Sequence, residues 1–153
     1  MTAYRGKFLP ENKEKYRGSV LNITYRSSWE LFVMKMLDNN PEVKQWSSEE
    51  TIIPYFSNAD GKKRRYFMDF TVFWKNGSIS LWEVKPEAEV RPPIPPARAT
   101  VAAKKRFLNQ IYTYQVNTDK WKAAVKVCDQ KGWRFNIITE TTLKKLGFKG
   151  LER

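Results

Sequence analysis

The chain has 153 residues, with 28 lysines and arginines against 16 aspartates and glutamates, and a formal net charge of +12. It contains no histidine and a single cysteine, Cys128. These numbers exclude a Ser-His-Asp or Cys-His nucleophile, a zinc site built from His or Cys, and an internal disulfide. The length suits one domain with a real core, and the basic charge favours nucleic acid as the partner over a role in solubility or in binding an acidic protein.

The first 24 residues are polar, and we expect an N-terminal arm with little regular structure, followed by one domain over residues 25–153. Residues 1–10 lack the apolar core of a signal peptide, and no stretch approaches the length of a membrane span. We therefore expect a protein of the cell interior. Twelve of the 16 acidic residues lie within residues 1–97, so acid-based chemistry has to be sought there.

The first predicted element is a helix that begins at Ser27-Ser28 and ends at Asn39-Asn40-Pro41, because its apolar residues recur at helical spacing. Residues 51–56 are rich in strand formers and precede a turn at residues 58–61. Residues 66–74 and 78–85 are predicted to be two strands of a hairpin around Lys75-Asn76-Gly77.

Five prolines within residues 86–96 predict a stiff extended connection. Two helices are expected next, over residues 99–116 and 119–131, with Thr118 capping the second and Gly132 ending it. A last strand over residues 133–139 and a short helix over residues 141–146 complete the order. This order predicts a single α/β domain with a central mixed sheet flanked by helices.

Glu83 and Lys85 are the most informative residues, because alternate residues of a strand share a face and this strand is otherwise apolar. Burying both charges is costly unless something such as a divalent metal compensates, and the alternative is a half-exposed edge strand. Asp69 interrupts another apolar run, where an ionised carboxylate also needs a partner. The alternative for Asp69 is an ion pair with Arg64 or Arg65.

The length of the hairpin loop decides whether Asp69 and Glu83 meet. A two-residue turn would place Asp69 opposite Val84, on the wrong side. A three-residue loop, with Gly77 in the left-handed region, pairs Trp74 with Ser78 and places Asp69 opposite Glu83, on one face with Lys85. We predict the three-residue loop.

Glu30 is the third candidate acid, and two roles are open to it. Ser27-Ser28-Trp29-Glu30 has the pattern of a capping box, in which Glu30 reaches back to the backbone of Ser27. Glu30 also lies beside the apolar stripe of its helix, from which it can point over the edge of the sheet. A ligand and a committed cap cannot be the same conformer.

Glu30 in a first helix, Asp69 in a strand and Glu83-Val84-Lys85 in the next strand resemble the PD-(D/E)XK nuclease superfamily, with a restriction-endonuclease-like core. The segment Tyr25-Arg26-Ser27-Ser28-Trp29-Glu30, together with Met68-Asp69-Phe70, is similar to the TnsA-like endonucleases. It is still more similar to the head completion nucleases of T-even phages. Met68 stands where the superfamily name has proline.

The resemblance implies that Asp69 and Glu83 hold Mg²⁺, for which Mn²⁺ can substitute, and that Glu30 completes the acidic cluster. Lys85 would orient or activate the attacking water or stabilise the phosphate. These roles suit the chemistry, because Mg²⁺ prefers carboxylate oxygens and lowers the pKa of bound water.

Gln110 and Tyr114 resemble a Gln-x-x-x-Tyr motif of RecB-type relatives, in which these side chains support the site and contact DNA. Apolar residues at helical spacing are usually packing, and we favour a core position for Ile111 and Tyr114. Basic side chains are candidates for phosphate contacts before the Asp69 strand and on the two late helices, with solvated surface as the alternative: Lys62, Lys63, Arg64, Arg65, Lys104, Lys105, Arg106, Lys120, Lys122 and Lys126.

The leading hypothesis is a Mg²⁺-dependent nuclease of double-stranded DNA with little sequence specificity. By resemblance, it would trim packaged DNA during phage head completion, in the host cytoplasm or within the virion, in contact with head or neck proteins. One alternative is a non-catalytic basic head-tail joining or DNA-binding protein whose acids are structural. Another is a transposase-like subunit that cuts only within a complex.

Overall fold

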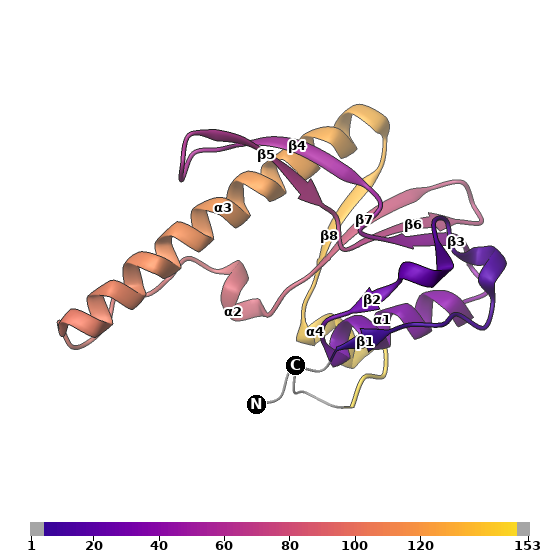
Figure 1. Ribbon diagram of the computed structural model, residues 1–153, viewed down its shortest axis with the longest axis horizontal. Helices are drawn as coiled ribbons and strands as arrows, with labels where there is room; N and C mark the ends of the chain where they lie inside the picture. The colour runs from indigo at the N-terminus through magenta and orange to yellow at the C-terminus, as the bar shows by residue number, and fades with distance from the viewer. Residues whose placement is uncertain (1–4, 150–153) are drawn as a thin grey trace.

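The computed structural model describes residues 5–149, and its central element is a four-stranded mixed sheet of order β3-β6-β7-β8 (Figure 1). β3 (Val43–Ser48) pairs with β6 (Phe70–Trp74), and β6 pairs with β7 (Ile79–Val84), in both cases antiparallel. β8 (Arg134–Ile138) runs parallel to β7. This confirms the predicted α/β class with a mixed central sheet.

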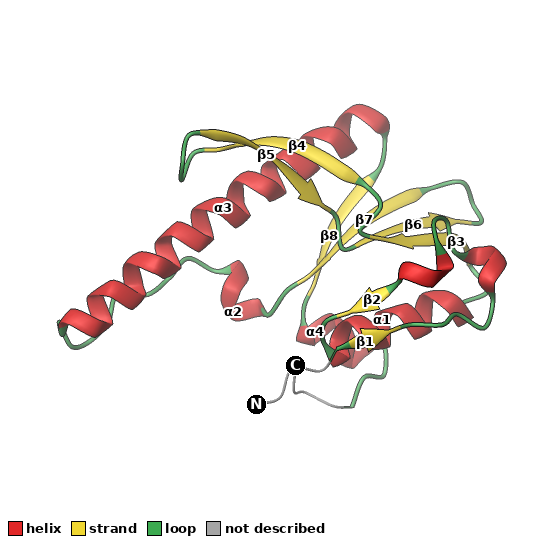
Figure 2. Cartoon of the chain, in the orientation of Figure 1, coloured by secondary structure: helices red, strands yellow, loops and turns green. Residues whose placement is uncertain are grey.

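Two smaller antiparallel pairs flank the central sheet. β4 (Ile52–Ser57) and β5 (Lys62–Phe67) form a ribbon, and β1 (Gly6–Lys7) pairs with β2 (Thr24–Tyr25). The helices are α1, α2, α3 and α4, which span Ser28–Asn39, Glu87–Val90, Val101–Lys131 and Glu140–Lys145. The β4–β5 ribbon crosses α3, and α1 lies with the N-terminal segment on the other side of the sheet (Figure 2).

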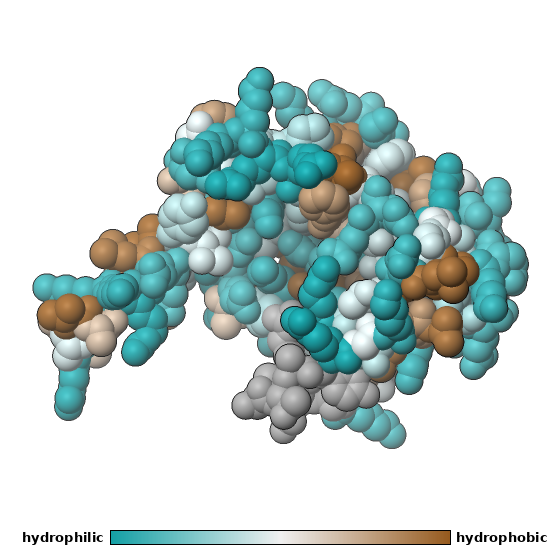
Figure 3. All heavy atoms as spheres, viewed as in Figure 1, coloured by the Kyte–Doolittle hydropathy of each residue, from teal (hydrophilic) through white to brown (hydrophobic). Residues whose placement is uncertain are grey.

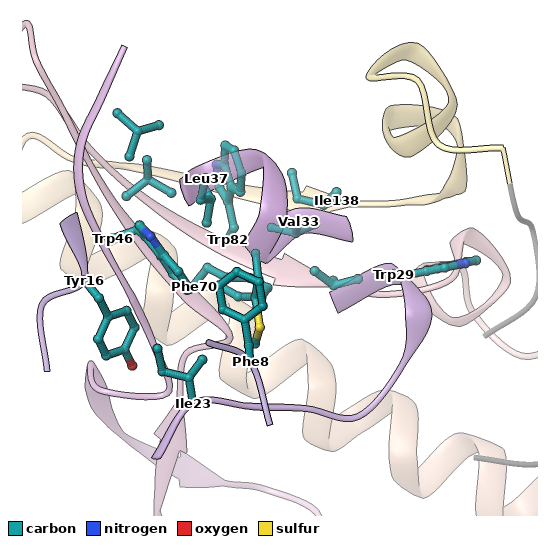
Figure 4. Close-up of a cluster of buried hydrophobic side chains, with 14 of the residues drawn as sticks. Phe8, Tyr16, Ile23, Trp29, Val33, Leu37, Trp46, Phe70, Trp82 and Ile138 are labelled. Atoms are coloured by element: carbon teal, nitrogen blue, oxygen red, sulfur yellow. The ribbon is translucent and has the colours of Figure 1, made fainter. Parts of the chain in front are cut away.

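The larger core lies between α1 and the sheet, and Trp46 is at its centre (Figure 4). The Trp46 ring meets those of Phe8, Tyr16 and Phe70 at centroid distances of 5.9, 4.8 and 6.4 Å. The N-terminal segment is irregular, as expected, but it is not a free arm, because Phe8, Tyr16 and Ile23 are buried in this core. Its described residues pack as part of the same domain.

A second, smaller core lies between the other face of the sheet, the ribbon and α3. It contains Met68 and Leu81 together with Ala124 and Cys128 of α3. All buried residues of α3 fall between Asn117 and Cys128. The first half of α3 therefore extends beyond the domain, as the projecting helix in Figure 1 and the arm at the left of Figure 3 show.

Two strand predictions need correction. β3 was not predicted, because only Val43 and Trp46 stand out among its polar residues. The run over residues 66–74, predicted as one strand, is divided between β5 and β6, which belong to different sheets. The chain crosses from one sheet to the other at Met68 and Asp69, where the side chain of Asp69 accepts the backbone N–H of Val84.

The predicted hairpin register is confirmed. Phe70 is opposite Trp82, and the N–H of Trp74 donates to the carbonyl of Ser78 at 2.9 Å. Gly77 has a φ of +91°, the left-handed conformation that the three-residue loop requires. This register continues toward Asp69 and Glu83 at the opposite end of the two strands.

The proline-rich connection and the long helix also differ from prediction. The connection contains a short helix, α2, that begins directly after Pro86 and ends before Pro92, so prolines flank it without interrupting it. The two expected helices are one, since α3 continues through residue 118. The Thr118 hydroxyl donates to the Tyr114 carbonyl within the helix instead of capping a new one, whereas Gly132 ends α3 as predicted. Among residues 5–149, no helix has the length and apolar character that crossing a membrane requires.

Candidate active site

The structure brings Asp69 and Glu83 together at one end of the β6–β7 hairpin. Asp69 directly precedes β6, and its Oδ2 accepts a hydrogen bond from the backbone N–H of Val84 at 2.8 Å. The strand register places Asp69 opposite Glu83, and the pKa of the Asp69 carboxyl is raised by its neighbour Glu83. Asp69 does not pair with either arginine of the alternative interpretation, because Arg64 pairs with Asp60 and Arg65 lies over the ring of Phe67.

Two aromatic side chains hold Glu83 in place. Glu83 is only 6% exposed, and its Oε1 accepts hydrogen bonds from Tyr66 Oη at 3.0 Å and from Trp121 Nε1 at 3.3 Å. Burial, and then the nearby negative charge of Glu83, raises the pKa of Tyr66 well above its usual range. Tyr66 therefore remains a neutral hydrogen-bond donor to the carboxylate.

The surroundings of Asp69 change the pKa of its carboxyl group. Removal from solvent raises the pKa of its carboxyl well above the ordinary value, and contact with Glu83 raises it further. The charge of Glu30 acts in the same direction, and the N–H of Val84 acts against it. Two carboxylates in contact repel each other when both are ionised, so the pair is incomplete without a proton or a cation between its members.

Lys85 follows β7 directly, and its backbone N–H donates to the carbonyl of Ile138 at 3.0 Å. This bond continues the β7–β8 pairing by one residue, so strand alternation places the side chains of Glu83 and Lys85 on the same side of the sheet. Neither of the two ion pairs within residues 5–149 involves Lys85. Its ammonium group is therefore not committed to a carboxylate.

Glu30 adopts the capping role in this structure. Its Oε1 accepts a hydrogen bond from the backbone N–H of Arg26 at 3.0 Å, one residue before the expected acceptance from Ser27. In return, the Ser27 hydroxyl oxygen accepts from the backbone N–H of Glu30 at 3.1 Å. Because the charge of Glu30 raises the pKa of Asp69, the cap is electrostatically close to the carboxyl pair.

The donor set of this site is suitable for a hard divalent cation. Within the described residues, no group of three or more His, Cys, Asp or Glu side chains is arranged to hold a metal. Mg²⁺ nevertheless binds through one or two carboxylates and keeps several waters. Protein donors occupy Oδ2 of Asp69 and Oε1 of Glu83, and Oδ1 and Oε2 are the atoms suited to a cation.

The basic residues that precede Asp69 lie on β5, and all four are exposed. Alternation along the strand places Lys62 and Arg64 on the side of Tyr66, and Lys63 and Arg65 on the opposite side. Arg64 is engaged by Asp60, so the remaining three carry the uncompensated charge of this ribbon.

The structure does not bring Gln110 to the carboxyl pair. Gln110 lies on the projecting half of α3, three turns before Trp121, and is exposed together with Lys104 and Lys105. Ile111 is 42% exposed, so its predicted core position is wrong, and Tyr114 is only partly buried.

A groove of about 1040 Å³ lies between this part of α3 and the proline-rich segment. Gln110, Tyr114 and Asn117 line its helical side, Arg91 and the prolines line the other, and Arg106 contributes a second positive charge. The proline-rich segment is thus one wall of a groove that begins directly after Lys85.

Sequence reasoning missed Tyr66 and Trp121, the two hydrogen-bond donors to Glu83. Tyr66 was visible only as the first residue of an apolar run, and Trp121 only as an aromatic residue on a helix. Their role depends on how β5 and α3 pack over the sheet, for which neither spacing nor composition carries a signal.

Comparison with known proteins identifies the family of the chain. Residues 40–140 match the family model "TnsA-like endonuclease N terminal". The chain is also 55% identical over 148 residues to a head completion nuclease of Enterobacteria phage T4, which covers 97% of this chain and 99% of the relative. No solved structure matches the chain. The matched region includes Asp69, Glu83, Lys85 and Trp121, and the chain belongs to the TnsA-like endonuclease family.

Proposed function

We propose that the protein is a divalent-metal-dependent nuclease that hydrolyses DNA phosphodiester bonds during phage head completion. The observation that carries the proposal is the placement of Asp69 beside Glu83 at the end of the β6–β7 hairpin, next to Lys85, in a chain without histidine. The TnsA-like endonuclease family and the relative named head completion nuclease support the reaction and its setting in an infected host cell.

Asp69 and Glu83 would hold the metal, and Glu30 would complete the acidic cluster through water or after leaving its cap. When bound, Mg²⁺ or Mn²⁺ would neutralise the carboxyl pair, polarise the phosphoryl oxygen and lower the pKa of a bound water. Glu83 is fixed for this role by Tyr66 and Trp121, and Asp69 by Val84. Pre-positioned ligands of this kind avoid a reorganisation cost during the reaction.

Lys85 would supply the positive charge that the carboxylates lack. Its side chain lies on the same side as that of Glu83, so its ammonium can orient the attacking water or stabilise charge on the phosphate. The four-carbon stem allows the ammonium to follow the phosphate as it moves. None of these steps requires an imidazole group.

The DNA duplex would lie across the site between the β4–β5 ribbon and the projecting half of α3. Lys62, Lys63 and Arg65 are exposed on the two faces of the ribbon, and Arg91, Arg106 and Gln110 line the groove beside α3. Contacts of this type bind the phosphate backbone without reading sequence, which agrees with little sequence specificity. Lys104 and Lys105 would extend the contact along the projecting helix.

Purified protein incubated with supercoiled plasmid and Mg²⁺ tests the proposal. We expect nicked and linear products that disappear in EDTA and with Asp69→Ala, whereas Asp129→Ala, a matched change at an exposed aspartate, retains cleavage. Equal cleavage by wild type and Asp69→Ala would rule out the assigned site. A folded wild type that binds DNA without cutting it would favour the non-catalytic joining protein, and cleavage only with added partner proteins would favour the transposase-like subunit.

A further inference from the structure

The neighbourhood of the carboxyl pair is rich in negative charge, which a DNA phosphate has to approach. Besides Asp69 and Glu83, it includes Glu30 and Glu49, whose backbone N–H donates to the carbonyls of Met68 and Asp69 at 3.1 and 3.2 Å. Glu49 is paired with Arg26, so Lys85 alone opposes the other three carboxylates. A second cation at this position would reduce the repulsion of DNA.

Arg26 is that second cation. Its Nη1 donates to Glu49 Oε1 at 3.0 Å, and its Nη2 lies 2.9 Å from Oε2, so the pair is bidentate. The Arg26 side chain is 50% exposed and faces solvent at the edge of the site. The pKa of Arg26 is raised first by Glu49, and then by the charges of Glu30 and Asp69, so the guanidinium lies within the field of the whole acidic group.

The backbone of Glu49 explains how Arg26 is held there. Glu49 is the only residue other than glycine with a positive φ, +56°, among residues 5–149. Such a conformation persists only where the surroundings fix it, and it is enriched at functional sites. Here the two hydrogen bonds from the Glu49 N–H fix it directly beside Asp69. Glu49 thereby connects the backbone of one proposed metal ligand to the guanidinium of Arg26.

We infer that Arg26 binds a backbone phosphate of DNA beside Asp69, and that Glu49 is the positioning residue that holds Arg26 in place. The inference rests on the proposed nuclease function and adds a phosphate ligand to its site. A guanidinium has five N–H donors, and the bidentate pair with Glu49 uses two of them. The other donors and the exposed half of the side chain remain for a phosphate, for which arginine geometry is well suited.

The first part of the test measures DNA binding without cleavage. The full chain is titrated with a fluorescent duplex oligonucleotide in EDTA at several salt concentrations. Arg26→Ala should lower the slope of log K against log salt by about one, the value expected for one lost phosphate contact. Lys35→Ala removes one exposed charge from the outer side of α1 and should leave the slope unchanged. Equal slopes for Arg26→Ala and wild type overturn the inference.

The second part measures plasmid cleavage with Mg²⁺. Arg26→Ala should lower kcat by about 10- to 100-fold, with partial recovery in Arg26→Lys. Glu49→Gln should lower kcat by a smaller factor. In the Arg26→Ala background, Glu49→Gln should have no additional effect, because Glu49 acts through Arg26. An additional loss in the double variant overturns the positioning role.

The two parts separate this inference from the proposed function. A wild type that binds DNA but does not cut it contradicts the nuclease, while the salt slope still decides whether Arg26 contacts phosphate. If Asp69→Ala abolishes cleavage and Arg26→Ala behaves like Lys35→Ala in both measurements, the nuclease stands and the Arg26 inference is wrong. A folded wild type that does not bind DNA contradicts both.

Discussion

Two kinds of buried carboxylate occur in this protein. Some, here called anchors, accept hydrogen bonds from the chain on both oxygens and connect distant segments, whereas those of the candidate site do not. Asp38 and Asp119 are 2% and 7% exposed, as buried as Glu83 at 6%. Both oxygens of Asp38 accept backbone N–H groups of the N-terminal segment, and both oxygens of Asp119 accept donors from Asn58 and Gln115. These acids are satisfied by the chain itself.

The Asp69–Glu83 pair is satisfied only in part. One oxygen of each carboxyl group accepts from the chain, and the two groups then meet each other, with the pKa of Asp69 raised as a result. Burial of an acid is therefore not sufficient to identify a site. The informative feature is a buried acid that interacts with a second acid.

The largest expected effect is the loss of cleavage on removing either member of the pair. Asp69→Ala and Glu83→Ala should each lower plasmid cleavage by more than about 10³-fold, because each removes a proposed metal ligand. Asp38→Asn changes one of the anchors, and the folded fraction of this variant should retain cleavage. A comparable loss of cleavage in Asp38→Asn, with an unchanged circular dichroism spectrum, would contradict the distinction between the anchors and the carboxyl pair.

Lys85→Ala should have the next largest effect, a decrease in kcat of about 10²- to 10³-fold, since it removes the cation beside the pair. Lys75→Ala changes the same charge in the exposed hairpin loop at the opposite end of the strands and should cleave like wild type. Single-turnover kinetics provides the measurement. Normal rates for Lys85→Ala would show that the carboxyl pair works without this ammonium.

Substitution of an anchor should lower the stability of the fold and leave cleavage unchanged. Asp119→Ala leaves the Asn58 and Gln115 donors without their acceptor, and it should lower the free energy of unfolding by about 2–3 kcal/mol in urea titrations. Cleavage by the folded fraction should remain close to wild type. Asp129→Ala, at an exposed acid of the same helix, is the matched control. An unchanged free energy of unfolding in Asp119→Ala would show that Asp119 is not an anchor.

The hydrogen-bond donors to Glu83 should have a smaller effect. Trp121→Phe and Tyr66→Phe preserve most of the ring packing and each remove one bond to Oε1, so each should lower cleavage by about 10-fold, equivalent to about 1.4 kcal/mol. Trp133→Phe tests a nearby tryptophan that does not touch Glu83 and should be neutral for cleavage. Losses of equal size at Trp121 and Trp133 would point to packing instead of positioning.

The smallest expected effect concerns pH. The raised pKa of Asp69 means that the native state holds this proton more tightly than the unfolded chain does. The contribution of Asp69 to the free energy of unfolding is therefore favourable below pH 3.8, the ordinary pKa of the group, and it is lost as the pH rises through the raised pKa of the native state. Without divalent ions, Asp69→Asn should be more stable than wild type by about 1 kcal/mol at neutral pH, and this difference should vanish in acid. Urea titrations at several pH values measure it, and a difference independent of pH would contradict the assignment.

Local pattern was enough to predict the hairpin register and the helix that begins at Ser28, because each depends on a few neighbouring residues. The pairing of Trp74 with Ser78 distinguishes the two loop lengths, and the register then determines that Asp69 is opposite Glu83. The capping by Glu30 follows from spacing in the same way, although it reaches Arg26 instead of Ser27.

The features that could not be predicted depend on packing between distant segments. Thr118 resembles a helix cap in sequence, but α3 continues through it, because Asp119 is hydrogen-bonded to Asn58 of the ribbon turn and the helix is packed on the domain from Asn117 onward. The donors to Glu83 come from β5 and α3, 17 and 38 residues away in the chain. Similarly, Trp46 sits in a polar strand whose place in the sheet only the tertiary structure reveals.

Binding of Mn²⁺ by the full chain, measured by isothermal titration calorimetry without DNA, is the most direct test of the Asp69–Glu83 pair as the cation site. We expect one site in wild type that is lost in Asp69→Asn and retained in Asp119→Asn, together with a metal-dependent increase in thermal stability that follows the same pattern. Equal Mn²⁺ binding by wild type and Asp69→Asn would contradict the account.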